Sequence, residues 1–175
     1  SDMPAPLPLK FLAATAMVLV ILSAVWAMRE GPLRDPEAAM KDFYAATARA
    51  EDQLADPLIL NGHGVVPLVV KDIQHKEMPL RRYAIGFLGN GRYGEALPIL
   101  RVILADETEK FYFRADALIA IHQISPSVAT DLAHRYVNGE ELLGRVAKQI
   151  VSGAANDSGI FERRSWWKAF FAVHE

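Results

Sequence analysis

A glycine-rich loop from Gly89 to Gly94 has the residue spacing of a dinucleotide-binding site. Its sequence, Gly-Asn-Gly-Arg-Tyr-Gly, matches the G-x-G-x-x-G pattern and follows an apolar run over 83–88. In such sites the glycines let the backbone approach a pyrophosphate at a helix N-terminus. The pattern also needs a second strand that ends in an acidic residue about 20 residues later, but Asp106 comes too early and Glu109 lies in a polar break. We therefore favour a turn between two helices and keep a nucleotide-binding protein or enzyme as the alternative.

The other residue types that commonly perform catalysis form no coherent set. The chain has no cysteine, which excludes thiolate metal sites, disulfides and a cysteine nucleophile. Its five histidines never stand in H-x-x-x-H spacing, and no serine lies in a G-x-S-x-G context. The acidic pairs 106–107 and 140–141 lie near expected helix ends, where they complement backbone dipoles. We expect no catalytic residue, no cofactor, no metal and no small-molecule substrate.

The C-terminal stretch from Phe161 combines basic and aromatic side chains. Two interpretations fit it: a helix that caps the open end of a helical stack, or a helix that docks on a partner protein or on the membrane interface. The preceding residues 152–159 indicate a flexible connector, which favours docking. Aromatic members of the stretch would supply most of the binding energy, and basic members would orient the contact. The residues expected to bind a partner or membrane are Arg163, Arg164, Trp166, Trp167, Phe170 and Phe171.

The composition of the chain limits the class of protein to which it can belong. A length of 175 residues suffices for one domain with an appendage, and a hydrophobic fraction of 51% is too high for a disordered chain. The formal net charge of −2, without a long run of either sign, argues against a nucleic-acid partner. We therefore expect a folded protein that binds another protein.

Apolar residues recur at helical spacing along residues 36–151, with short polar breaks. Asp35-Pro36 is a strong start signal, since the aspartate can cap a helix whose first residue is proline. The first helical stripe runs from Ala39 to Leu54. Residues 65–70 could locally pass for a strand, but their proline cannot donate to a ladder. The expected fold is all-α, built from antiparallel helix pairs.

The helical segments also repeat. Arg81-x-x-Ala84-x-x-x-Leu88-Gly89 aligns with Arg114-x-x-Ala117-x-x-x-Ile121-His122, which begins 33 residues later. The stretch 91–100 likewise echoes 62–69. A period of about 30 residues with two helices in each unit is typical of a solenoid.

Residues 81–104 resemble a HEAT-type (Armadillo-type) repeat, with an arginine, Leu-Gly, a glycine-rich turn and Ala-x-Pro-x-Leu. The resemblance is weaker over 110–137, which lacks the proline, and partial over 50–75, so that it covers about half of the chain. It implies a short α-solenoid that binds a protein partner through one face, because such repeats bury a core only by stacking.

An uninterrupted apolar run over 11–28 precedes the helical domain. As a helix it would be about 27 Å long, close to the hydrocarbon thickness of a bilayer. Lys10 and Arg29 bracket the run, and Trp26 lies where an interfacial aromatic residue belongs. A cleaved signal peptide and a helix buried in a core are the alternatives. We expect a single transmembrane anchor.

The orientation of the anchor has two opposing indications. Arg29 and Arg34 outnumber Lys10, which favours a cytoplasmic position for the domain that follows. The absence of cysteine suits an oxidising compartment and favours the opposite side. We expect the domain on the non-cytoplasmic, periplasmic side.

The sequence thus divides into an N-terminal tail, an anchor, a repeat domain, a connector and a C-terminal helix. Their ranges are 1–10, 11–28, 36–151, 152–159 and 160–175. Ser1 and Asp2 are interpreted as vector-derived residues before a natural start at Met3. The expected function is that of a non-enzymatic, single-pass membrane scaffold or accessory subunit, whose helical repeats bind a protein partner belonging to a membrane complex.

Overall fold

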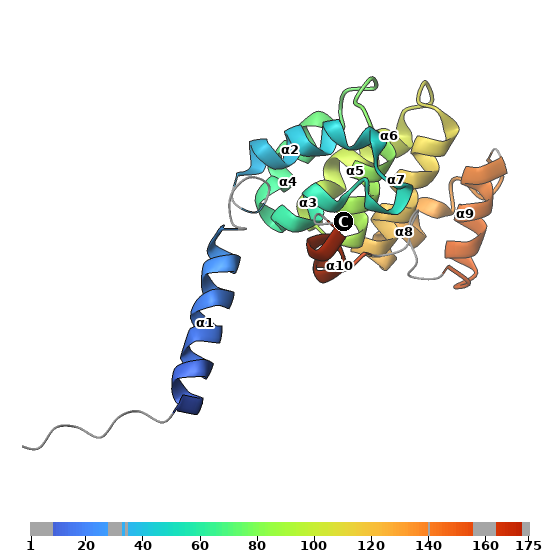
Figure 1. The fold of residues 1–175 in the computed structure, drawn as a ribbon. Coiled ribbons are helices and arrows are strands. Elements are labelled where there is room, and N and C mark those ends of the chain that lie inside the picture. Colours follow the sequence, from blue (N-terminus) through green and yellow to red (C-terminus); the bar gives the residue numbers. More distant parts are fainter. Residues whose placement is uncertain (1–8, 28–32, 34, 140, 156–163, 173–175) are drawn as a thin grey trace, which may run out of the picture.

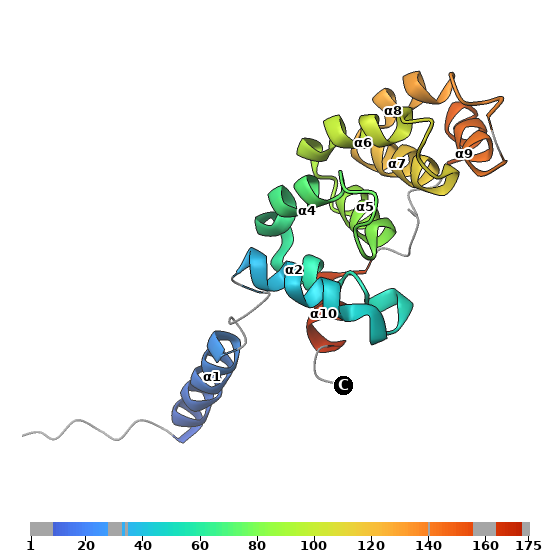
Figure 2. The same ribbon diagram turned by 90° about the horizontal axis from the view of Figure 1, so that it is seen from above.

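The chain folds into helices joined by short turns, as the computed structural model in Figures 1 and 2 shows. The structure describes residues 9–27, 33, 35–139, 141–155 and 164–172, and these contain no β-strand. The α-helices are α1 (Leu9–Ala27), α2 (Pro36–Ala45), α3 (Asp56–Asn61), α4 (Val66–Asp72), α5 (Arg81–Asn90), α6 (Leu97–Ala105), α7 (Phe111–Ile124), α8 (Pro126–Ala133), α9 (Glu141–Val151) and α10 (Trp166–Ala172). Short 3-10 helices are η2 (Ala46–Ala48), η3 (Glu51–Gln53), η4 (Gly62–Val65) and η5 (Gly94–Ala96). The predicted all-α class is confirmed.

Proline sets where many of these helices begin. Asp35 caps α2 by accepting a hydrogen bond of 3.0 Å from the Glu37 amide, and Pro36 opens the helix. The first turns of α3, α4, α6 and α8 each contain a proline as well. Residues 66–70 are therefore helical, as their proline indicated.

The expected helical stripe from Ala39 to Leu54 is broken in the structure. Helix α2 ends at Ala45, and two turns of 3-10 helix separate it from α3. The backbone of Ala50 is extended, with ψ of 148°. Leu54 is nevertheless buried, whereas Ala50 is exposed, so the apolar spacing was right for part of the stripe and wrong on helix continuity.

Helix α7 lies at the centre of the C-terminal half of the fold. It packs against α5, α6, α8 and α9, and its buried residues belong to one continuous hydrophobic core that extends back to α2. Several of these residues are alanines, including Ala117 and Ala120, which let neighbouring helices approach closely. The core thus extends from α2 to α9.

Arg81 and Arg114, which the sequence alignment pairs, make equivalent contacts. The Arg81 Nε donates to the Ile73 carbonyl at 2.8 Å, and the Arg114 Nε donates to the Leu104 carbonyl at 2.9 Å. Each guanidinium carbon also lies over an aromatic ring, at 4.8 Å from the ring centroid for Arg81 and 5.6 Å for Arg114. Both arginines therefore connect the start of one helix pair to the end of the preceding helix.

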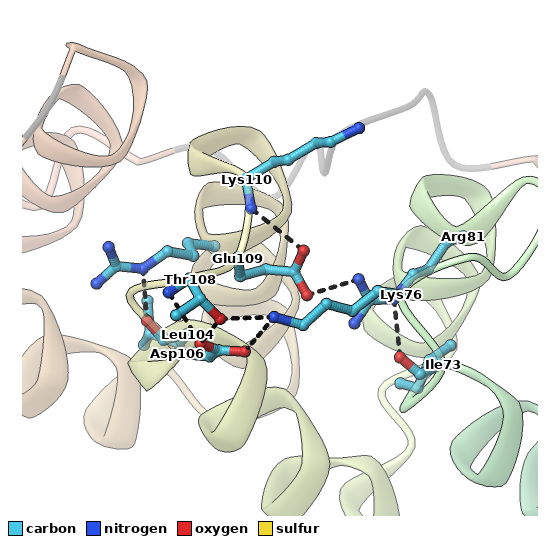
Figure 3. Close-up of polar contacts among 9 residues, drawn as sticks. Ile73, Lys76, Arg81, Leu104, Asp106, Thr108, Glu109 and Lys110 are labelled. Carbon is cyan, nitrogen blue, oxygen red and sulfur yellow. Dashed lines mark hydrogen bonds and ion pairs between the residues drawn. The ribbon is translucent and has the colours of Figure 1, made fainter.

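A polar cluster joins the turn after α4 to the turn after α6 (Figure 3). Arg81 forms a buried ion pair with Glu109, with Nη1 and Oε2 2.7 Å apart. Nearby, the Lys76 Nζ lies 2.8 Å from the Asp106 carboxylate and donates to the Thr108 hydroxyl at 2.7 Å. The buried pair is shielded from water, whereas the Lys76 contacts are accessible to solvent.

Acid should weaken this cluster through Asp106. The Lys76 ammonium, together with the hydroxyl and amide of Thr108, holds the pKa of Asp106 well below its usual range. Because the folded-state pKa is depressed, ionised Asp106 stabilises the fold above the unfolded pKa of about 3.9, and this contribution is lost as pH falls through the folded value. We expect Asp106→Asn to lower stability at neutral pH and to approach the unmodified chain in acid, measured by urea unfolding.

Glu107→Gln changes a neighbouring exposed carboxylate and serves as the control for Asp106→Asn. A stability difference that stays constant between neutral and acidic pH would show that Asp106 acts through its shape and not its charge.

Helix α1 stands clear of the other helices in both Figure 1 and Figure 2. The side chains of residues 15–25 are all exposed, although most of them are apolar. Within the described part of the chain, no helix has both the length and the apolar character needed to cross a membrane. The transmembrane anchor over 11–28 remains a prediction, and Met28 and Arg29 lie outside the described residues.

Candidate functional site

Helix α10 folds back from the C-terminal end of the chain onto α3, near the N-terminal end of the helical domain. The indole Nε1 of Trp166 donates to the Leu60 carbonyl at 3.2 Å, and Ala169 is buried against this surface. Helix α10 therefore packs near the first helices of the domain and not beside α9, the helix that precedes it in the sequence. On α9, the side chains of Arg145, Lys148 and Gln149 are exposed.

Arg164 fixes the start of α10 through ion pairs with one buried carboxylate, Asp56, and one exposed carboxylate, Asp52. Its Nε lies 2.7 Å from Oδ1 of Asp56, and its Nη1 lies 3.0 Å from Oδ2 of Asp52. The Arg164 side chain is only 13% exposed and that of Asp56 only 1%. Arg164, which the sequence analysis expected to orient a partner contact, is thus largely buried and joins α10 to the segment 52–56.

Burial changes the pKa of the Asp56 carboxyl. Desolvation raises the pKa of this carboxyl above its usual range, and the ion pair with Arg164 pulls it partly back. Sequence analysis missed Asp56, because an aspartate before a proline is usually a helix-start residue. Its partner stands more than a hundred positions away in the chain, so local spacing held no signal for the pair.

The aromatic residues of α10 divide into an inner and an outer pair. Trp166, 38% exposed, and the half-buried Phe170 stack with ring centroids 4.9 Å apart. Trp167 and Phe171 stack at 6.2 Å, and they are 64% and 65% exposed. Of the predicted binding residues, the structure thus presents Trp167 and Phe171 to solvent, while Arg163 lies outside the described residues.

The loop from Gly89 to Gly94 is a helix end and not a phosphate cradle. It follows α5, and the amides of Gly91, Arg92 and Tyr93 donate to carbonyls of Phe87, Gly89 and Leu88. Amides engaged in this way are not directed at a ligand, as a pyrophosphate site requires. Packing explains two of the glycines, because a Cβ on Gly89 would meet α7 and one on Gly91 would meet the Tyr93 ring.

A cavity of about 140 Å³ lies beside this loop. It is formed where η3 and α3 face α5, and Arg164 lines it from the start of α10. Its lining consists of Glu51, Asp52, Ala55, Ile59, Tyr83, Gly86, Phe87, Asn90, Gly91, Tyr93 and Arg164. Three aromatic rings and two carboxylates therefore surround one small space.

The histidines take no part in this arrangement. The His63 Nε2 lies 2.5 Å from Oε1 of Glu95, and both side chains are largely exposed. Across the described ranges, no group of three or more His, Asp or Glu side chains is placed to hold a metal ion.

Comparison with protein families, with curated proteins and with solved structures gives no match for this chain.

Proposed function

We propose that this protein is a non-enzymatic, membrane-anchored scaffold or accessory subunit that binds a protein partner. The observation that carries the proposal is the outer face of α10, where Trp167 and Phe171 are stacked, exposed and held on a tethered helix. Aromatic residues are enriched at the centres of protein interfaces, since each buries much area with few rotatable bonds. A rigid helix presents them without the entropic cost of ordering a loose tail.

The helical domain is proposed to be a short HEAT-like solenoid. Polar side-chain contacts between its units recur at sequence separations of 28 to 34 residues, close to one repeat. Arg81 and Arg114 supply a second support, because they occupy equivalent places in successive helix pairs. Repeat units that contact only their neighbours form extended surfaces suited to protein recognition.

Helix α1 is proposed to anchor this domain in a lipid bilayer, with the domain on the non-cytoplasmic side. Its large apolar side chains expose 44–66% of their surface: Met17, Val18, Leu19, Val20, Ile21, Leu22 and Val25. Covering an apolar surface of this extent is favourable, because each square ångström of apolar surface removed from water contributes roughly 25 cal/mol of stabilising free energy. The apolar run in the sequence also continues on both sides of the described side chains.

Replacing both outer aromatics of α10 tests the proposed partner surface. We expect Trp167→Ser with Phe171→Ser to reduce recovery of the partner by at least tenfold, since each fully buried aromatic contributes about 1.5–3 kcal/mol. Thermal unfolding should change little, because both side chains are already exposed. The measurement is quantitative co-purification from native membranes, followed by mass spectrometry and by the melting temperature of the purified chain.

The matched control is Phe111→Ser with Val102→Ser, which removes two exposed apolar side chains from other helices. A partner lost equally from both double variants would not be bound by α10. A large fall in melting temperature with intact recovery would make α10 a purely structural element.

A further inference from the structure

The cavity beside α3 and α5 has walls suited to a flat cation. Tyr83, Phe87 and Tyr93 contribute rings, and the Phe87 and Tyr93 centroids lie 5.2 Å apart. Ring faces carry negative potential and attract guanidinium and ammonium groups. The volume of about 140 Å³ is close to that of a cavity that admits a benzene-sized group.

The charged groups around the cavity also select against an anion. Glu51 and Asp52 place two carboxylates at its rim, against the single cation Arg164. Arg164 already forms ion pairs with Asp56 and Asp52, and it donates a hydrogen bond of 3.3 Å to the Lys168 carbonyl. A phosphate or carboxylate ligand would therefore meet two carboxylates and one guanidinium that is already paired with acidic residues.

Glu51 is the carboxylate best placed to receive a new donor. It accepts one hydrogen bond of 2.8 Å from the Tyr83 hydroxyl. A carboxylate offers about four acceptor positions, so this bond leaves capacity for a second partner. Burial and this same bond raise the pKa of Tyr83 to about 12, which keeps the phenol neutral and donating to Glu51.

We propose that this cavity binds an arginine side chain of the protein partner. The planar guanidinium would lie against the Tyr93 ring and donate two parallel hydrogen bonds to Glu51. A pairing of guanidinium and carboxylate groups already occurs beside the cavity, where Arg164 forms ion pairs with Asp52 and Asp56. The inference deepens the proposed function, since it specifies one residue type that the partner contributes.

The test uses small probes and does not need the partner. N-acetyl-arginine amide is titrated into the full chain in detergent micelles, and amide resonances of Asn90, Gly91 and Tyr93 are followed by NMR. We expect saturable shifts that weaken at high salt. The citrulline analogue, which has the same shape without charge, should bind at least tenfold more weakly. Glu51→Gln should weaken arginine binding at least fivefold, whereas Glu107→Gln, an exposed carboxylate elsewhere, should not.

Several outcomes would overturn the inference. Equal binding of the arginine and citrulline probes would make the cavity an apolar site without charge selection. Unchanged affinity in Glu51→Gln would remove the proposed acceptor, and Tyr93→Leu with unchanged affinity would remove the stacking contact. An absence of saturable shifts would end the proposal for this cavity, and it would leave partner binding by α10 to be judged by its own experiment.

Discussion

Replacing Arg81 by alanine is expected to lower the free energy of unfolding by about 3–5 kcal/mol, the usual cost of breaking a buried ion pair from one side. The variant leaves the Glu109 carboxylate buried without its partner and the Ile73 carbonyl without its donor. It also removes the guanidinium from the Phe113 ring. Urea unfolding followed by circular dichroism measures the loss.

Two further variants separate the charge effect from lost packing. Arg101→Ala removes an exposed arginine from α6 and should change stability by less than about 0.5 kcal/mol. Arg81→Met with Glu109→Leu replaces the pair by apolar side chains of similar size, and it should recover most of the stability. If the double variant is as unstable as Arg81→Ala, hydrogen bonding to Ile73 and ring packing matter more than the unpaired charge.

Gly89→Val is the second substitution expected to have a large effect. A Cβ at this position would lie 2.8 Å from the Cα of Ala120, on the backbone of α7. Valine has a better helix propensity than glycine by about 0.5 kcal/mol, but overpacking a helix contact costs about 1–3 kcal/mol and occasionally more. Because the obstacle is backbone, we expect a net loss of about 3 kcal/mol in urea unfolding.

Gly94→Val is the matched control, since it changes the last glycine of the same loop. A Cβ at Gly94 would meet nothing within 4 Å, so its effect should stay within about 0.5 kcal/mol. Equal losses from the two variants would show that the loop itself, and not the contact of α5 with α7, requires glycine.

Local signals in the sequence were sufficient to locate most helices. Prolines at helix starts, as at Pro98 and Pro126, and apolar stripes such as that of α7 have physical effects within one or two turns. The stripe from Ala39 to Leu54 was wrong because helical spacing is defined only while the backbone stays helical, and the helix ends at Ala45.

The placement of α10 could not be obtained in this way. The Arg164 contacts with Asp52 and Asp56 join residues far apart in the sequence, and no periodicity encodes such a pair. Aromatic composition indicated that α10 makes contacts. It could not distinguish Trp166, which contacts α3, from Trp167, which is exposed to solvent. The cavity that takes the proposed arginine was missed for the same reason, since its walls come from three separate segments.

The return of α10 to α3 also alters how the fold should come apart. A linear array of helix pairs frays from its two ends, because a terminal unit has a neighbour on one side only. Here α10, the last helix of the chain, packs on α3, so that opening the first helices of the domain also requires releasing α10. Unfolding should therefore be more cooperative than in an open array. Folding should be slower, because the contact between α3 and α10 closes a long loop. In hydrogen-exchange measurements, the amides of α3 and α10 should therefore show similar protection, although the two helices are far apart in the sequence.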